Sequence, residues 1–251
     1  MKSNDFYVEK LLFSYKPILS NFRSFRRGNR DTREGDFSGS LFKAFVGEDL
    51  KGFRRTDIYR SMLSNVHYQH LLDRMQYFHP ISPSFIVLMK PLLGLIHAEK
   101  GKLLLSNGQK PTRVWYVLKG FVKETSYDSG IGRTSWFWME GDFVYAYPGF
   151  FSQGTAINDI EVIDDAVLIE ISYEKFMELR NGFEEVPLLV EKIRDHYDGK
   201  RLEHASDVLI LKAANRFKKF ILENKKLFGV AKRRDIASFL GIKDDSLRRF
   251  G

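Results

Sequence analysis

The chain has 251 residues, 43% of them hydrophobic, which is enough for one or two domains with a sizeable core. It contains no cysteine, which excludes disulfides, thiolate zinc sites, cysteine-ligated iron–sulfur clusters and cysteine nucleophiles, and which fits a cytoplasmic protein. Its formal net charge of +8 makes a nucleic-acid partner worth testing.

The basic charge is concentrated at the two ends of the chain. Residues 1–60 carry 13 Lys/Arg and 8 Asp/Glu, a net charge of +5, and residues 212–251 carry 12 and 4, a net charge of +8. Because the total is +8, residues 61–211 carry −5. The C-terminal excess favours a phosphate-binding surface, with a solvated basic face as the alternative.

Residues 1–61 combine eight Phe with many Arg and the polar run RRGNRDTREGDFSGS. A weak helical pattern at Tyr7–Leu19 is followed by a stretch whose composition is typical of disorder. We expect a basic, poorly ordered extension. Nucleic-acid binding by its interleaved basic and aromatic residues is the alternative, and Met62 is an alternative start of the protein.

Targeting and membrane signals are weak in this sequence. The first ten residues lack the apolar core of a signal peptide. The longest apolar stretch, Phe85–Ile96, is too short to span a bilayer and contains Lys90 and Pro91. We therefore expect a soluble protein with no membrane partner.

The next segment is predicted to be helical. Apolar residues at helical spacing indicate a helix over Tyr59–Phe78. Ser82-Pro83-Ser84 predicts the start of a second short helix, because proline is favoured in a first helical turn. Lys90-Pro91 should interrupt that helix.

From Leu92 the pattern changes to short strands. Turn-like dipeptides separate them, among them Asn107-Gly108, Lys119-Gly120 and Asp164-Asp165. The eight predicted strands are Leu95–Glu99, Lys102–Ser106, Val114–Leu118, Phe121–Tyr127, Thr134–Met139, Phe143–Tyr147, Ala156–Ile163 and Val167–Ser172. Eight short strands in so few residues predict an antiparallel barrel or jelly roll.

Helices are predicted again after the strands. A short one at Tyr173–Leu179 precedes a long one at Phe183–Leu211, which has a possible weak spot at Asp198-Gly199. A helix of that length, about 40 Å, exceeds what one small β-roll can cover. We expect the rest to pack on a second copy of the chain, with packing on its own domain alone as the alternative. A further helix at Ala213–Asn224 and a connector at Lys225–Gly229 should follow.

The last nineteen residues, RRDIASFLGIKDDSLRRFG, have the spacing of a helix-turn-helix. Counting from Arg233, the small residue Ala237 falls at position 5, where two helices cross, and Gly241 falls at position 9, where the turn needs positive φ. The apolar positions that would seal the two helices together are Ile236, Leu240, Ile242, Leu247 and Phe250. An amphipathic helix pair without a DNA partner is the alternative.

Several stretches resemble one family of bacterial transcription factors, the cyclic-AMP receptor protein and fumarate–nitrate regulator (Crp/Fnr) superfamily. The resemblance covers about residues 65–251, is strongest in the helix-turn-helix, and is closest to the branch common among Bacteroidetes. The stretches that carry it are WYVLKGFVKE (115–124), WFWMEGDFV (136–144), VLIEISYEKFMEL (167–179), LKAANRFKKFI (211–221) and IASFLGIKDDSLRR (236–249).

The resemblance implies an α+β fold with an antiparallel β-roll (jelly roll), flanking helices, a long dimerisation helix and a C-terminal helix-turn-helix. The expected domains are the extension at 1–61, a cyclic-nucleotide-binding-like β-roll at 62–182, the dimerisation helix at 183–211 and a partial DNA-binding domain at 212–251. Family members continue past the recognition helix into a wing or further helix. The chain ends at Gly251, and we expect a truncated, wingless unit.

The ligand residues of the family are not matched. Cyclic-nucleotide binders hold the ribose and phosphate with a Gly-Glu pair and a later Arg-Ser/Thr. Ungapped matching places Tyr145-Ala146 and Ala156-Ile157 at those positions, so the guanidinium and the carboxylate are missing. We predict no cyclic-nucleotide binding and no cofactor. The candidate pocket, which holds another ligand or is filled by its own aromatics, comprises Trp136, Trp138, Tyr145, Tyr147 and Ala156.

The resemblance also implies a DNA-contacting set. Lys243, Ser246 and Arg249 correspond to groove-facing residues and Arg248 to a phosphate contact, while the helix pattern exposes Arg233 and Arg234 towards phosphates. Lys243 replaces the usual Ser/Thr cap, and Asp244 and Asp245 follow it in the first turn. The implied partners are double-stranded DNA, a second copy through residues 183–211, and RNA polymerase.

The two alternatives to a DNA-binding regulator are a metal enzyme and a sensor or scaffold. A cupin-type metal enzyme needs several histidines inside the barrel, but only His97 of the six histidines falls on a predicted strand. We predict no metal site, no catalytic residue and no enzyme. The stronger alternative is a β-roll sensor or scaffold with a degenerate output domain, which the absent wing and the acidic first turn favour.

Overall fold

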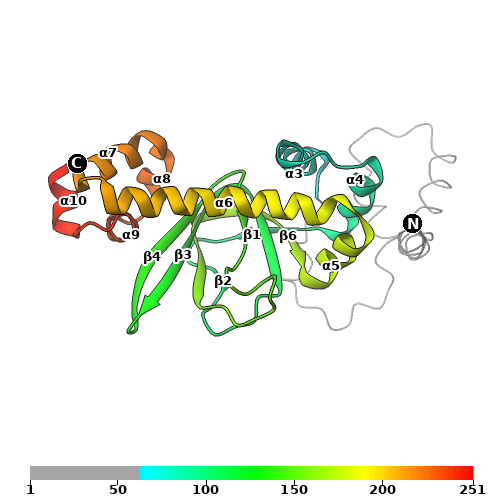
Figure 1. Ribbon diagram of the computed structural model, residues 1–251, viewed down its shortest axis with the longest axis horizontal. Helices are drawn as coiled ribbons and strands as arrows, with labels where there is room; N and C mark the ends of the chain where they lie inside the picture. Colours follow the sequence, from blue (N-terminus) through cyan, green and yellow to red (C-terminus); the bar gives the residue numbers. More distant parts are fainter. Residues whose placement is uncertain (1–62, 251) are drawn as a thin grey trace, which may run out of the picture. The chain divides into compact units, whose positions relative to one another are not determined.

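The computed structural model describes residues 63–250, which belong to one compact unit (Figure 1). The predictions made for residues 1–61, and the expected start of the first helix at Tyr59, lie outside the described residues. Among the described helices, none is long and apolar enough to cross a membrane.

Two short helices precede the sheet. Helix α3 (Asn65–Phe78) and helix α4 (Pro83–Met89) each begin after a serine whose hydroxyl accepts a hydrogen bond from a backbone N–H three residues on. Proline stands at the first position of α4, as predicted, and the α-helix ends where Lys90-Pro91 was expected to interrupt it. A short 3₁₀ turn, η2 (Lys90–Leu92), continues into the sheet.

The sheet has six described strands, all paired antiparallel. Its order is β1-β6-β3-β4, with β2 paired to β6 and β5 paired to β3. The strands are β1 (Gly94–Ala98), β2 (Leu103–Leu105), β3 (Arg113–Asp128), β4 (Ile131–Trp138), β5 (Phe143–Val144) and β6 (Asn158–Ser172). The predicted fold class, an α+β chain with an antiparallel jelly-roll-like sheet and flanking helices, is confirmed.

The predicted number of strands is wrong, because two dipeptides taken for turns are irregularities inside continuous strands. Lys119-Gly120 lies within β3, Asp164-Asp165 lies within β6, and the two sites face each other where the β3–β6 register shifts. Gly120 has φ +96°, and a Cβ there would meet the carbonyl oxygen of Asp165 at 2.7 Å. Glycine therefore permits a close backbone approach here rather than a chain reversal.

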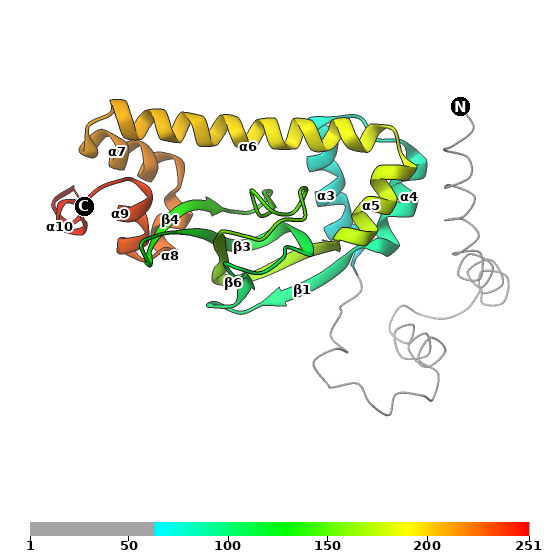
Figure 2. The ribbon, with the colours of Figure 1, turned by 60° about the horizontal axis from the view of Figure 1, so that its bottom comes forward.

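Two helices follow the sheet. Helix α5 (Tyr173–Gly182) begins after Ser172, whose hydroxyl accepts from the backbone N–H of Lys175. Helix α6 (Glu185–Ile210) has 26 residues and runs over the sheet from the α3–α5 end to the C-terminal helices (Figure 2). Its buried face is an apolar stripe at helical spacing, with Val186, Leu189, Ile193 and Tyr197 all buried. The expected weak spot is wrong, since α6 continues through Asp198-Gly199 without a break.

Four short helices complete the described chain: α7 (Ala213–Glu223), α8 (Lys225–Val230), α9 (Arg233–Phe239) and α10 (Asp244–Phe250). The predicted connector at Lys225–Gly229 is wrong, because these residues form most of α8 and bury Leu227. The four helices share an apolar core with Phe137 and Ile163 of the sheet. The C-terminal helices are therefore packed against the β-roll.

Candidate functional site

A turn at Gly241 joins helices α9 and α10. Gly241 ends α9 with φ +61°, and the backbone N–H of Ile242 donates to the carbonyl of Ala237 at 2.9 Å. Ile236, Ala237 and Leu247 are at most 3% exposed, so the small and apolar positions do face the partner helix.

The predicted DNA-contacting residues lie on one C-terminal unit. All five basic residues are exposed and Ser246 is half-buried; the five are Arg233, Arg234, Lys243, Arg248 and Arg249. Arg234 lies 3.7 Å from Asp235, and Arg248 lies 3.6 Å from Asp244 one turn earlier. Within the described part of the chain, the other three basic side chains have no ion-pair partner, which leaves them available to phosphates or base edges.

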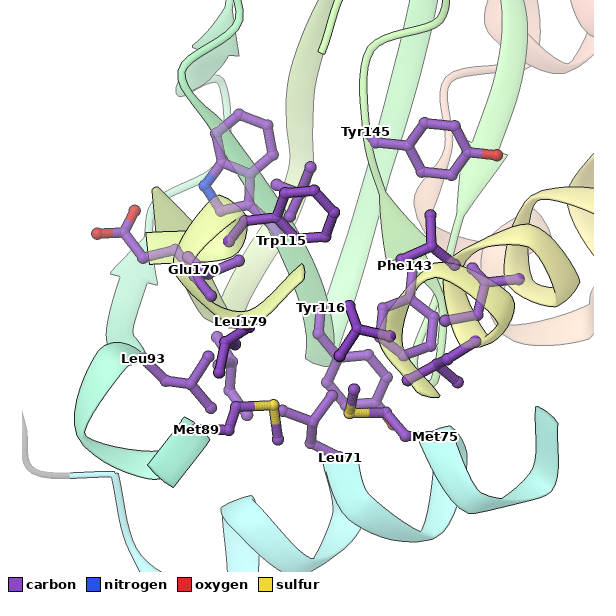
Figure 3. Close-up of a pocket in the computed structure, with 18 of the residues that line it drawn as sticks. Leu71, Met75, Met89, Leu93, Trp115, Tyr116, Phe143, Tyr145, Glu170 and Leu179 are labelled. Atoms are coloured by element: carbon purple, nitrogen blue, oxygen red, sulfur yellow. The ribbon is translucent and has the colours of Figure 1, made fainter. Parts of the chain in front are cut away.

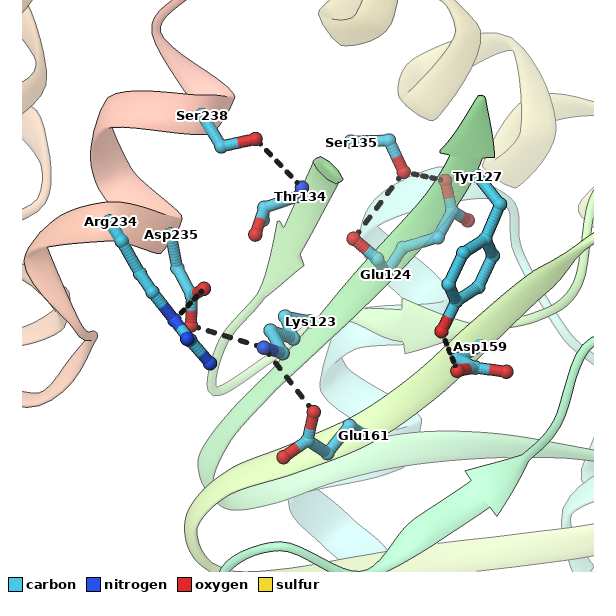
Figure 4. Close-up of polar contacts among 10 residues, drawn as sticks. All are labelled: Lys123, Glu124, Tyr127, Thr134, Ser135, Asp159, Glu161, Arg234, Asp235 and Ser238. Carbon is cyan, nitrogen blue, oxygen red and sulfur yellow. Dashed lines mark hydrogen bonds and ion pairs between the residues drawn. The ribbon is translucent and has the colours of Figure 1, made fainter. Parts of the chain in front are cut away.

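Helix α9 is fastened to the sheet by a buried ion network (Figure 4). The ammonium group of Lys123 on β3 lies 3.1 Å from Asp235 of α9 and 3.3 Å from Glu161 of β6. Lys123 and Asp235 are only 7% and 8% exposed. Beside them, the backbone N–H of Thr134 donates to the hydroxyl of Ser238 at 3.0 Å. Sequence reasoning missed this network, because a lysine inside an alternating strand gives no sign of a helix 112 residues later.

The C-terminal half of α6 is also held by polar groups. Arg201 donates two hydrogen bonds of 3.1 Å to the buried carboxylate of Glu124, which also accepts one from Ser135 at 2.7 Å. The Arg201 guanidinium lies 4.8 Å from the ring centroid of Trp136. Such a bidentate pair fixes direction as well as distance. Arg201 thus sets how α6 crosses the sheet.

His204 connects α6 to α9. Its ring stacks on Phe239, with centroids 3.9 Å apart and planes 5° apart, and its Nε2 lies 3.0 Å from the Phe239 carbonyl oxygen. Burial lowers the pKa of His204, because the charged imidazolium loses hydration there. The α6–α9 contact is therefore built around a histidine ring whose protonation is opposed by burial.

An apolar cavity of about 120 Å³ lies at the other end of α6 (Figure 3). Its wall is formed by α3, α4, α5, the N-terminal half of α6, β3, β5, β6 and the loop after β5. Figure 3 shows Leu71, Met75, Met89, Phe143 and Leu179 gathered around it. The cavity was not predicted, because its lining comes from segments spread over more than a hundred residues.

The five predicted pocket residues are placed apart from one another. Tyr145 lines the apolar cavity, and burial raises its pKa to about 12. Trp136 lines a second, more polar cavity of about 350 Å³ between β4 and helices α6, α7 and α9. Trp138 and Ala156 are each 1% exposed and line neither cavity, while Tyr147 is 51% exposed and also lines neither. A ligand contact by these five stays a prediction.

Comparison with known proteins identifies the central domain. Residues 95–182 match the cyclic nucleotide-binding domain family. No curated protein matches the chain in sequence. Within the described residues, no group of His, Asp or Glu side chains could hold a metal ion.

Solved structures share the fold. They include a Crp/Fnr-family transcriptional regulator from Eubacterium rectale, with TM-score 0.55 and 16% identity over 68% of this chain and 82% of that one. The c-di-GMP-responsive global regulator CLP from Xanthomonas campestris has TM-score 0.53 and 18% identity over 67% and 89%. FixK2 from Bradyrhizobium japonicum has TM-score 0.50 and 22% identity over 63% and 82%. Residues 95–182 are thus similar to the cyclic nucleotide-binding domain family, and the fold is shared with solved structures that include a Crp/Fnr-family regulator.

Proposed function

We propose that the protein is a cytoplasmic, dimeric, sequence-specific DNA-binding transcriptional regulator of the Crp/Fnr type, without enzymatic activity. The observation that carries this proposal is the α9–α10 pair, which has exposed Arg and Lys side chains and is packed beside a cyclic nucleotide-binding β-roll. A surface with a local net charge of +8 over residues 212–251 suits a polyanion.

Helix α10 enters the major groove in this proposal. Lys243, Ser246 and Arg249 face base edges, and Arg248 contacts a phosphate. Arg233 and Arg234, at the start of α9, bind the flanking backbone. Asp244 and Asp245 in the first turn of α10 suit the helix dipole. Near phosphates they are unfavourable unless one accepts from a cytosine amino group, which would select cytosine at that position.

A second copy of the chain supplies the second recognition helix of a DNA-binding dimer. Helix α6 leaves large apolar side chains exposed along its length, with Leu188, Leu202 and Leu209 at 41%, 73% and 85% exposure. These three are separated by 14 and 7 residues, the heptad spacing of a two-helix contact. Pairing two such helices buries the stripe and gives two recognition helices related by a two-fold axis. RNA polymerase is then a further partner at a promoter.

The β-roll is proposed to bind no cyclic nucleotide. The positions that would hold ribose and phosphate are Tyr145-Ala146 and Ala156-Ile157, and three of these four side chains are buried apolar or aromatic groups. None of the four offers a carboxylate or a guanidinium. Calorimetric titration with cyclic AMP and cyclic GMP should give no heat at micromolar ligand, and saturable heat would contradict this part of the proposal.

A non-DNA-binding β-roll sensor or scaffold is the second candidate. The observation that favours it is the docking of α9 on the sheet through buried Lys123 and Asp235, which commits one face of the helix pair to the chain itself.

Selection from a library of random duplexes distinguishes the two candidates. A regulator should enrich a pseudo-palindrome whose half-sites are about one helical turn apart. The variant Arg249→Ala should lose enrichment, while the matched variant Lys226→Ala, at an exposed position of α8, should retain it. If the wild-type protein enriches no sequence, the sensor or scaffold is the correct candidate.

A further inference from the structure

One side chain, Arg216 of α7, joins the end of α6 to the turn between α9 and α10. Its Nε donates to the carbonyl of Leu240 at 2.8 Å, and one terminal nitrogen donates to the carbonyl of Gly241 at 3.2 Å. The other terminal nitrogen donates to the carbonyls of Val208, at 3.1 Å, and of Leu211. The guanidinium therefore binds the backbone at the C-terminal ends of two helices, α6 and α9.

A guanidinium suits the ends of two helices for a physical reason. The last carbonyl groups of a helix have no partner within the helix, and this end carries a partial negative charge. The N–H donors of an arginine spread in one rigid plane, so they can reach two such ends at once. A lysine has all its donors on a single nitrogen, so it would retain the charge without holding both ends.

Side-chain contacts beside Arg216 support the same arrangement. Lys219, one turn further along α7, lies 2.7 Å from a carboxylate oxygen of Glu203 and 2.6 Å from one of Asp207, both on α6. The ring of His204, stacked on α9, adds a direct contact between α6 and α9. The helix-turn-helix is thus attached to the end of α6 in one orientation.

We propose that Arg216 is a positioning residue that fixes α10 relative to α6 and thereby sets which spacing of DNA half-sites the protein accepts. The inference rests on the proposed function, in which two copies pair through α6 and present two α10 helices to DNA. The distance and angle between those two helices then depend on how each α9–α10 pair is held on its own α6. Arg216 acts through the backbone of the turn and touches neither base nor phosphate.

Duplex DNA makes this spacing a strict requirement. One added base pair moves a half-site by about 3.4 Å along the axis and turns it by about 35°. A rigidly held pair of recognition helices matches one such arrangement, whereas a loosely held pair matches several. The sequence of each half-site is read by α10 itself, so it should not depend on Arg216.

Binding to duplexes of varied spacing tests the proposal. Each duplex carries two copies of the selected half-site, separated by one base pair more than in the last, and a further duplex carries one half-site alone. The wild-type protein should bind one spacing at least about tenfold more tightly than a spacing two base pairs away, because misalignment costs base contacts. Arg216→Lys should bring this ratio below about threefold, because the geometry of the fork is lost, and should leave affinity for the single half-site unchanged.

Two further variants support this comparison. Arg216→Gln removes the charge as well and should show the same loss of preference. The matched control is Lys218→Gln, at an exposed position of the same helix, which removes a charge and should retain the wild-type preference. Circular dichroism establishes that each variant folds, and the charge-retaining Arg216→Lys carries the test if Arg216→Gln does not fold.

A distance measurement tests the same contacts without DNA. The chain has no cysteine, so Lys192→Cys on α6 and Asp245→Cys on α10 introduce the only two labelling sites. Spin labels at these exposed positions, in chains diluted with unlabelled protein, should give one narrow distance distribution. Arg216→Lys should broaden the distribution, and Lys218→Gln should leave it unchanged.

The outcomes separate this inference from the proposed function. An unchanged spacing preference or an unchanged distance distribution in Arg216→Lys would overturn the inference. Equal weakening at every spacing and on the single half-site would also overturn it, because Arg216 would then affect affinity alone. A broadened distribution in a protein that selects no DNA sequence would contradict the proposed function and leave Arg216 as the residue that fixes α10 on α6.

Discussion

The two halves of α6 contact the rest of the protein through different chemistry. The N-terminal half contributes Val186, Leu189 and Ile193 to the apolar wall of a cavity. The C-terminal half is held by Arg201, which binds a buried carboxylate, and by His204, which stacks on α9. Apolar contacts are non-directional and can adapt to an occupant, whereas paired charges specify one geometry.

The two ends of α6 therefore differ in how firmly they fix the elements packed against them. The cavity end leaves space unfilled between hydrocarbon side chains. The polar end holds α9 in one place, because moving the helix would break the contact between two buried charged side chains, Lys123 and Asp235.

The largest effect is expected from Lys123→Met. Removing the ammonium group leaves Asp235 and Glu161 without their shared cation, and losing one partner of a buried pair costs about 3–5 kcal/mol. Urea unfolding at neutral pH measures the change. Lys119→Met, at an exposed position on the same strand, should cost under about 0.5 kcal/mol. A similar small cost for both variants would show that the network does not hold α9.

Adding one methylene should distinguish the cavity end from solid core. Val162→Ile, at a fully buried position of β6 outside the cavity, should destabilise the fold by about 1–3 kcal/mol through overpacking. Val186→Ile, in the cavity wall, should cost less than about 0.5 kcal/mol or be stabilising, because space is available. Equal costs in thermal unfolding would mean that the cavity is absent in solution.

Gly241→Ala tests the turn between α9 and α10. Because φ is +61° there, alanine should cost about 1–2 kcal/mol. The Cβ would also lie 3.3 Å from a methyl group of Val208. Gly229→Ala, inside α8 with open space around its Cβ, should instead stabilise the fold by about 0.5–1 kcal/mol. Chemical denaturation of the two variants should therefore give shifts of opposite sign.

The smallest effect concerns pH. Burial lowers the pKa of His204 in the folded state; Arg216 and Lys219 lower it further, and its hydrogen bond to Phe239 and the charge of Asp207 oppose this. As pH falls below about 6.5, the unfolded state therefore takes up the proton first, and stability is lost. His204→Gln should lose less stability between about pH 7.5 and 5.5 than wild type. An unchanged slope in His204→Gln would contradict the assignment.

Local patterns in the sequence are sufficient to predict most elements. The serine caps, the apolar stripe of α6 and the glycine between α9 and α10 are each decided by neighbours within a few residues. Gly120 was misread because a glycine that permits a turn also permits close approach of two strands, and only the partner strand decides which occurs.

The candidate sites depend on contacts that no local pattern contains. The Lys123–Asp235 pair joins residues 112 positions apart. The cavity results from how completely side chains of several elements fill a shared space, which depends on the packed structure rather than on any one segment. The exposure of the basic side chains Arg248 and Arg249 could be predicted, because it follows from the helical period of α10.

DNA recognition by the α9–α10 pair is the central claim, and one titration tests it most directly. Fluorescence anisotropy would follow wild type and Arg249→Ala on the selected duplex and on a scrambled duplex, at about 50 and 200 mM salt. We expect wild-type affinity to fall steeply with salt, and Arg249→Ala to lose about 1–3 kcal/mol on the selected duplex and little on the scrambled one. Equal wild-type affinity for the two duplexes, or no binding at low salt, would contradict the claim.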